Sequence, residues 1–348
     1  MSRPIYFAGL SLTSPRGVSS EDVVLYNIPE FATAYKEKFG IFFLPTVTDS
    51  ELSFERNKTR ILVHYFSSWK DYVIVTRPFS FSVEEVEAIA RKIRGESKVI
   101  ASIAASRLSS LTRLSSRFMG IVDGFEIDLG LTSLLIGEHR SFESYAIDVI
   151  EEFVSVSKRP VFVKVSPSVQ LSSEFLENLR QTGIAGMVFT PHIVYSIGRE
   201  FFRVHSPYLS KLYALIWAKL IASTDIPTAY ISDIPEHLLG EVSVEKTFDI
   251  LLFDTALLST LVDMPGVVEL DKEMPIRWRY IPDPLRPAID VVREPQCLNV
   301  CPYRAFSKEK NLHDSLSGLA VADEKCNVCG LCLSSCKDVK LMATLTPE

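Results

Sequence analysis

Residues 162–165 read Phe162-Val-Lys-Val165, and residues 250–253 read Ile250-Leu-Leu-Phe253. Both stretches are short and almost continuously apolar, which is typical of parallel strands that are buried on both faces. Similar short runs alternate along the chain with segments of helical period, at spacings typical of β/α units. The pattern therefore predicts an α/β protein built on a parallel sheet.

Eight strands are expected, at residues 5–12, 40–46, 99–103, 124–129, 161–165, 186–190, 228–232 and 250–254. Helices are expected between them, at residues 23–39, 83–94, 107–117, 142–156, 173–182, 209–223 and 242–248. Eight strands in this alternation predict a (β/α)8 TIM barrel. An open doubly wound sheet is the alternative, and it is less favoured because no G-x-G-x-x-G follows any strand.

The expected domain order is a barrel over residues 1–262, a linker over 263–292 and a small C-terminal domain over 293–348. Residues 53–76 predict an extra hairpin beside the barrel, because two β-rich runs follow each other there. Residues 195–208 are expected to form a long loop at the carboxyl end of the sixth strand. The linker is expected to be stiff because it is rich in proline.

All six cysteines lie in the small C-terminal domain. The run Cys326-Asn-Val-Cys329-Gly-Leu-Cys332-Leu-Ser-Ser-Cys336 has the C-x2-C-x2-C-x3-C spacing of bacterial-type iron–sulfur ligation. The fourth cysteine of such a run ligates the other cluster in two-cluster proteins, so the first three cysteines need a ligand from elsewhere.

Upstream, Cys297-Leu-Asn-Val-Cys301-Pro302 matches the second half of the same motif, with Val291 and Glu294 at its first two ligand positions. Assigned by the two-cluster pattern, one [4Fe-4S] cluster is expected, held by Cys301, Cys326, Cys329 and Cys332. Zinc is the alternative occupant because four cysteines also suit zinc, although zinc sites more often have two separated C-x2-C pairs.

Residues 290–348 thus resemble a bacterial two-cluster ferredoxin domain that retains one cluster. In such domains the third cysteine of one motif lies near the fourth cysteine of the other. The resemblance implies that Cys297 and Cys336 either form a disulfide or remain two free thiols, and a reducing cytosol favours the thiols.

Composition places the chain among ordinary globular proteins: 348 residues, 47% hydrophobic and 23% charged. A net charge of −6, without a long basic run, argues against a nucleic-acid partner. The amino terminus lacks the features of a secretory signal, and the apolar segment near residues 212–222 is too short to span a bilayer. The protein is therefore expected to be cytoplasmic, with no membrane partner.

Three further stretches resemble successive strands of the dihydroorotate dehydrogenase family, a flavin-binding barrel. They are Lys98-Val-Ile-Ala-Ser-Ile-Ala104, Gly124-Phe-Glu-Ile-Asp-Leu129 and Arg159-Pro-Val-Phe-Val-Lys-Val-Ser-Pro167. A barrel followed by a ferredoxin segment is also similar to part of the dihydropyrimidine dehydrogenases. The resemblance singles out Ser102, Asp128 and Lys164, and it implies an oxidoreductase of pyrimidine metabolism.

The chain departs from this family at the catalytic loop and at the phosphate site. Gly130-Leu-Thr-Ser133 replaces the loop that bears the family's cysteine or serine base, so that Ser133 and Thr132 remain as candidate bases. Ser232-Asp233-Ile-Pro235 and Phe253-Asp254-Thr255 replace the glycine-rich phosphate loops. Two carboxylates would repel a phosphate there, so we expect that FMN does not bind in the family's manner.

Two residues keep two interpretations each. Lys164 matches the family lysine that lies against the flavin ring, or it is a buried lysine paired with Asp128 on the neighbouring strand. His192 stands where the family has asparagine, so it is either a ligand-facing donor or a solvated loop residue. The expected function is an electron-transfer subunit that pairs with a flavin-containing barrel of this family; the alternative is an active FMN enzyme that passes electrons to its own cluster.

Overall fold

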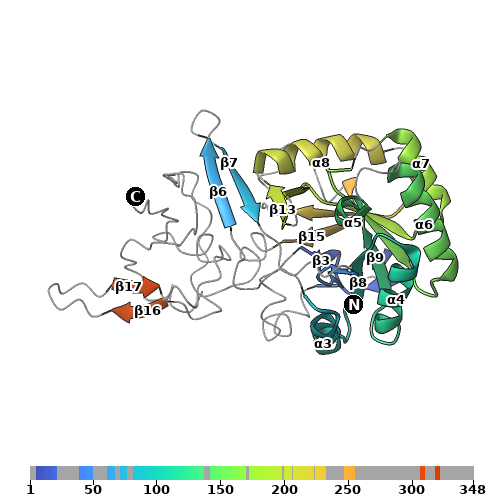
Figure 1. Ribbon diagram of the computed structural model, residues 1–348, viewed down its shortest axis with the longest axis horizontal. Helices are drawn as coiled ribbons and strands as arrows, with labels where there is room; N and C mark the ends of the chain where they lie inside the picture. Colours follow the sequence, from blue (N-terminus) through green and yellow to red (C-terminus); the bar gives the residue numbers. More distant parts are fainter. Residues whose placement is uncertain are drawn as a thin grey trace.

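The computed structural model describes residues 5–21, 39–49, 61–66, 71–76, 81–136, 142–169, 172–197, 200–205, 207–222, 224–232, 247–254, 306–309 and 318–321. Eight parallel strands form a closed barrel within this part of the chain (Figure 1). In chain order they are β3 (Arg16–Val18), β4 (Ile41–Phe43), β8 (Lys98–Ala104), β9 (Gly124–Asp128), β10 (Val161–Val165), β11 (Gly186–Phe189), β14 (Thr228–Ser232) and β15 (Ile250–Phe253). Pairing of β15 with β3 and of β4 with β8 closes the ring. The predicted (β/α)8 architecture is confirmed.

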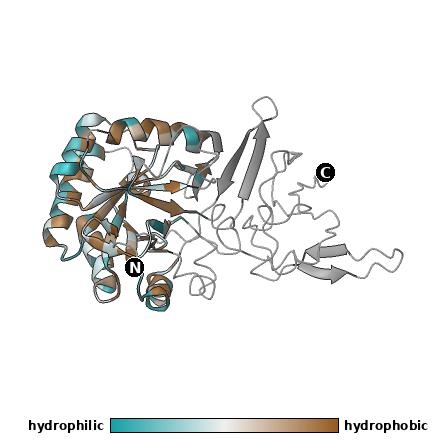
Figure 2. Cartoon of the chain, turned by 180° about the vertical axis from the view of Figure 1, so that it is seen from behind, coloured by the Kyte–Doolittle hydropathy of each residue, from teal (hydrophilic) through white to brown (hydrophobic). Residues whose placement is uncertain are grey.

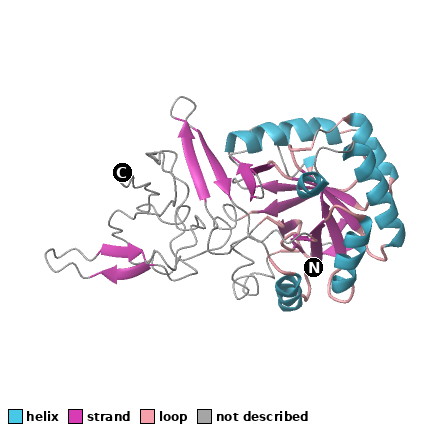
Figure 3. Cartoon of the chain, viewed as in Figure 1, coloured by secondary structure: helices cyan, strands magenta, loops and turns pink. Residues whose placement is uncertain are grey.

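Helices α3 (Val83–Ile93), α4 (Leu108–Phe118), α6 (Phe142–Val156), α7 (Ser173–Gln181) and α8 (Pro207–Ile221) lie on the outside of the barrel (Figure 3). Helix α5 (Leu129–Ile136) instead follows β9 directly and contacts β8, β10 and β12 (Ile193–Ile197) near the strand ends. The start of α3 has the expected capping box: Glu85 N donates to Ser82 Oγ at 3.3 Å, and Ser82 N donates to Glu85 Oε2 at 2.9 Å. None of the described helices is long and apolar enough to cross a membrane.

The core has two layers, because alternate residues of each barrel strand point to opposite sides. One layer lies between strands and helices, and it includes Val99, Phe125 and Val163. The other fills the barrel interior, and it includes Ile100, Phe162 and Val188. Figure 2 shows that the strands are mostly brown, the hydrophobic colour, and that the outer helices carry teal, hydrophilic patches.

The first predicted strand is wrong. Residues 5–12 form an antiparallel hairpin of β1 (Ile5–Phe7) and β2 (Leu10–Leu12), not a barrel strand. Phe7 and Leu12 belong to the interior core, and the ring of Phe7 stacks on that of Phe162 at 5.5 Å between centroids. The hairpin therefore covers the amino-terminal end of the barrel. The true first strand, β3, is only three residues long and follows Pro15, so it has no apolar run to reveal it.

A second sheet is built from two hairpins that are far apart in the sequence. Strands β6 (Ile61–Phe66) and β7 (Asp71–Thr76) form the hairpin expected from the sequence, and β12 (Ile193–Ile197) and β13 (Glu200–His205) form another. Pairing of β13 with β7 joins them into a four-stranded antiparallel sheet. The long loop predicted at 195–208 is thus wrong, because this segment forms most of β12 and all of β13 and begins α8.

The remaining described strands are short. Strand β5 (Val47–Thr48) adds to β8, and β16 (Phe306–Glu309) pairs with β17 (Gly318–Val321) as an antiparallel hairpin within the predicted small domain. Nearly all of the predicted helix at 23–39 lies outside the described residues, as do most of the predicted helix at 242–248 and the whole linker at 263–292.

Candidate functional site

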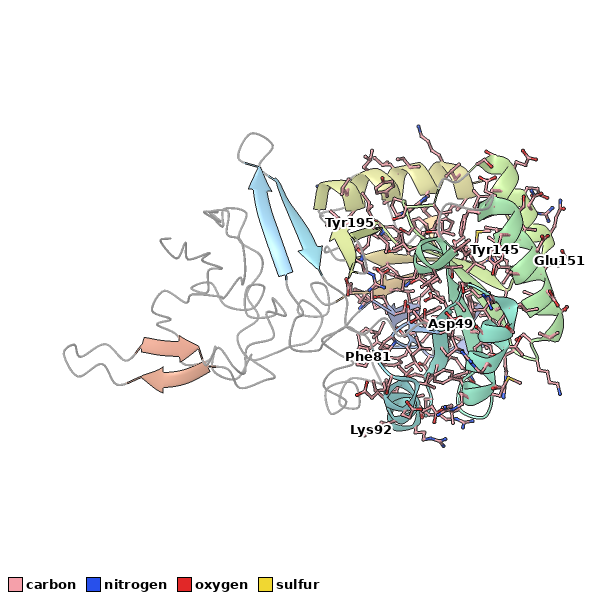
Figure 4. The ribbon with its side chains drawn as sticks, viewed as in Figure 1. Asp49, Phe81, Lys92, Tyr145, Glu151 and Tyr195 are labelled. Atoms are coloured by element: carbon pink, nitrogen blue, oxygen red, sulfur yellow. The ribbon has the colours of Figure 1, made fainter. Side chains whose placement is uncertain are left out.

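The carboxyl end of the barrel interior is lined by polar and charged side chains. Ser102, Lys164 and Thr190 each follow an interior core residue by two positions, and so they point to the same side of their strands. Glu126 and Asp128 continue this alternation on β9, and all five residues are at most 1% exposed. Side chains fill the space enclosed by the strands (Figure 4). The end of the barrel at which TIM-barrel enzymes have their active sites is therefore occupied by a cluster of buried polar side chains.

Lys164 is at the centre of this cluster. Its Nζ lies 2.8 Å from Asp128 Oδ2, 3.3 Å from Glu21 Oε1 and 3.8 Å from Glu126 Oε1. It also donates to Ser20 Oγ at 2.8 Å. Asp128 is its direct neighbour in the register of β9 and β10, as one of the two interpretations from the sequence requires. The ammonium group is therefore surrounded by carboxylate and hydroxyl oxygens.

The Glu21 carboxylate contacts side chains that come from several strands of the structure. Glu21 follows β3, and its Oε2 lies 2.6 Å from His192 Nδ1 and accepts a hydrogen bond from Thr190 Oγ1 at 2.8 Å. Its Oε1 lies 3.5 Å from Arg203 Nε as well as near Lys164. One carboxylate thus contacts three basic side chains from β10, from the segment after β11 and from β13.

The sheet beside the barrel supplies Arg203. This residue lies on β13, is 5% exposed, and reaches Asp128 Oδ2 with one terminal nitrogen at 3.9 Å. His192 lies just before β12 and is 2% exposed, so the interpretation of a solvated loop histidine is wrong. Its Nε2 is 3.9 Å from Asp254 Oδ2, at the end of β15. Figure 4 labels Tyr195 of β12, which lies at the side of the barrel next to β13.

The pKa values follow from this burial and pairing. Burial disfavours the charged form of Glu21, but Arg203, Lys164 and His192 together hold its pKa well below 4.5. Burial likewise opposes the charge of Lys164, yet Asp128 and the two glutamates raise its pKa above 10.5. For Glu126 burial dominates and raises its pKa above 4.5, although Lys164 opposes this shift. The two glutamates of the cluster are therefore driven in opposite directions.

No family model matches this chain, and no curated protein matches it in sequence. Among solved structures, it is similar to a soluble mutant of the membrane-associated (S)-mandelate dehydrogenase from Pseudomonas putida. The identity is 10%, the similarity covers 73% of this chain and 70% of that chain, and the TM-score is 0.46. At this level the similarity says nothing about the chemistry of the site.

The other residues singled out from the sequence are more scattered. Ser102 is buried and shares a hydrogen bond with Thr46 Oγ1 at 2.8 Å. Ser133 lies in α5, a helix where a loop was expected, and its hydroxyl donates to Gly130 O at 2.7 Å within that helix. Asp233, Thr255 and all six cysteines lie outside the described residues. In the part of the chain that is described, no three His, Cys, Asp or Glu side chains are arranged so that they could hold a metal ion.

Three charged members of the cluster were missed from the sequence. Glu21 was missed because β3 was not recognised as a strand. Glu126 stood in a quoted stretch, and the two-residue alternation with Asp128 would have placed it in the barrel interior. Arg203 was noted only as part of a loop, and its place in the cluster depends on the pairing of β13 with β7, which no local pattern shows.

We expect the acid stability of the protein to depend on Glu21. Its folded pKa lies below the unfolded value, so its contribution is present above pH 4.5 and is lost as pH falls through the folded pKa. Thermal unfolding from about pH 7 to about pH 3 should show a shallower loss of stability in Glu21→Gln than in the wild type. Glu143→Gln, which alters an exposed carboxylate on α6, is the control. Equal slopes in wild type and Glu21→Gln would contradict the assignment.

Proposed function

We propose that this chain is an iron–sulfur electron-transfer subunit of a dihydroorotate or dihydropyrimidine dehydrogenase-type oxidoreductase. The observation that carries the proposal is the spacing of Cys326, Cys329, Cys332 and Cys336 together with Cys301-Pro302. Of these, Cys301, Cys326, Cys329 and Cys332 would hold one [4Fe-4S] cluster, which supplies one-electron transfer. A barrel followed by such a domain is also what the sequence resemblance to this class of enzyme implies, and a barrel is present in the part of the chain that the structure describes.

The surroundings of Lys164 support a barrel without its own FMN. In the family that the sequence resembles, the matching lysine lies against the flavin ring. Here the Lys164 side chain is 0% exposed, and its Nζ lies 2.8 Å from both Asp128 Oδ2 and Ser20 Oγ. Binding of a ring against Nζ would have to break these contacts, and buried ion pairs are costly to break.

The end of β15 supports the same conclusion. A flavin phosphate in such barrels lies beyond the seventh and eighth strands. Asp254 stands directly after the eighth strand and is 8% exposed. Two like charges at roughly 4 Å repel each other by about 4 kcal/mol at an effective dielectric constant of roughly 20. The described residues there do not fit a phosphate, and the proposed flavin belongs to a partner barrel of the same family in a hetero-oligomer.

One observation favours a second candidate, an FMN-dependent dehydrogenase that passes electrons to its own cluster. Buried titratable groups with shifted pKa values gather at active sites, and Glu21, Glu126 and Lys164 are such groups at the catalytic end of this barrel. In this alternative the cluster of charges would rearrange when a ligand enters.

Analysis of iron, sulfide, zinc and flavin in one anaerobically purified sample separates the two candidates. Broad visible absorbance with about four iron per chain and no flavin is expected for the electron-transfer subunit. About one flavin per chain would instead assign catalysis to this barrel. Zinc without iron would contradict both candidates, because no electron could then pass through the C-terminal domain.

A further inference from the structure

The carboxylate of Glu21 is surrounded as a bound anion would be. Its Oε2 lies 2.6 Å from His192 Nδ1 and accepts a hydrogen bond from Thr190 Oγ1 at 2.8 Å. Its Oε1 lies 3.3 Å from Lys164 Nζ and 3.5 Å from Arg203 Nε. Ammonium, guanidinium, imidazole and hydroxyl groups are the donors that proteins use to bind carboxylates. Each oxygen of this carboxylate therefore faces two such groups.

The four donor residues are held in place by contacts that do not involve the glutamate. Lys164 lies in β10, which pairs with β9 and β11 on its two sides. The main chain of His192 is fixed at both ends, because its carbonyl accepts from Ser166 Oγ at 2.7 Å and its N donates to Thr190 Oγ1 at 3.3 Å. Arg203 lies in β13, between β12 and β7. The donor set is thus built by the sheets themselves.

The electrostatic field at this position favours a negative charge. Burial alone would raise the pKa of Glu21, yet the basic side chains around it hold that pKa well below 4.5. Three other carboxylates contact the same basic side chains, at 2.8 to 3.9 Å: Asp128, Glu126 and Asp254. They reduce the positive potential around Glu21 without cancelling it.

One half of the donor set is poorly matched to the side chain that fills it. Glu21 Oε1 and Arg203 Nε are both buried, and neither has a hydrogen-bond partner within the described part of the chain. The backbone of Glu21 is tied down, because its N donates to Ser19 Oγ at 3.2 Å and Ser19 N donates to Phe253 O at 3.0 Å. This tether limits how far the carboxylate can move towards Arg203. A free carboxylate has no such tether.

We propose that Glu21 occupies a binding site for a small carboxylate anion, so that the chain blocks the carboxyl end of its own barrel. A ligand carboxylate would reach the donor residues only in exchange for the side chain of Glu21. The ligand class follows from the occupant, which is a planar group with two oxygens that face two donors each. This autoinhibitory contact belongs to the barrel and needs neither a flavin nor a cluster.

Opening the site with Glu21→Ala tests the proposal on the full-length protein. Alanine removes the carboxylate and leaves space for acetate. Sodium acetate should therefore raise the thermal midpoint of this variant in a saturating manner, by about 2–4 °C at roughly ten times the acetate dissociation constant. Acetamide has a similar size without the charge and should not raise it. Where the variant folds poorly, the folded yield after refolding replaces the thermal midpoint, and acetate rather than acetamide should increase it.

Three further proteins serve as controls. The wild type should show no saturating response to acetate, because its own carboxylate fills the site. Glu21→Gln should show none either, because the amide fills the same space. Adding Arg203→Met to Glu21→Ala should remove much of the response. A Glu21→Ala protein that gains no more from acetate than from acetamide, in either measurement, would overturn the proposal, and so would an equal saturating response in the wild type.

Discussion

Replacement of Lys164 by methionine is expected to lower the free energy of unfolding by about 3–5 kcal/mol, because it leaves buried carboxylates without their cation. Lys164 is 0% exposed and lies within 4 Å of three carboxylates, on Glu21, Glu126 and Asp128. Arg203 would remain near two of them but cannot replace an ammonium at the centre of the cluster. Chemical denaturation at neutral pH measures the loss.

Two further variants make this prediction specific. Arg117→Met removes an exposed cation that pairs with Glu84 and Glu87 on the barrel surface, and it should change stability far less. The double variant Lys164→Met with Asp128→Leu should recover part of the loss, because replacing both members of a buried pair by apolar residues avoids the uncompensated charge. A Lys164→Met protein as stable as the wild type would show that the cluster does not stabilise the barrel.

Replacement of Cys301 by alanine is expected to remove most of the iron and of the visible absorbance. In the proposed cluster Cys301 would be the fourth ligand, because three thiolates from the run at 326–332 do not complete a cubane. Cys297→Ala is the matched control, because this cysteine lies four residues away and is assigned to the lost second site. Its iron content should stay at about four per chain.

The outcomes of this pair distinguish several assignments. Equal loss of iron in both variants would show that the two upstream cysteines are both ligands and that the two-cluster pattern does not apply. Retention of iron in Cys301→Ala would show that the fourth ligand comes from elsewhere, with Cys336 as the next variant to make. Free-thiol titration of the unfolded wild type, with and without reductant, then decides between a disulfide and two thiols for Cys297 and Cys336.

Elements that have a clear local pattern in the sequence could be predicted, and elements that lack one could not. The bounds of β10, β14 and α6 agree with the sequence prediction, because each is a periodic or continuously apolar run between clear breaks. The short strand β3 has no such run. Residues 5–12 form a β-rich stretch, so the sequence predicts a single strand there. The structure turns at Ala8 and Gly9, both with positive φ, and forms the hairpin β1–β2 instead.

By itself the sequence determined the barrel class and the cysteine spacing, together with the neighbouring positions of Asp128 and Lys164, because these depend on patterns within one or two strands. Only the tertiary structure decided which charges meet. Glu21 and Lys164 are separated by most of the barrel in sequence, and Arg203 reaches Asp128 through a second sheet. Closure of the barrel brings these groups out of water together, and burial then makes each one depend on its partners for its charge.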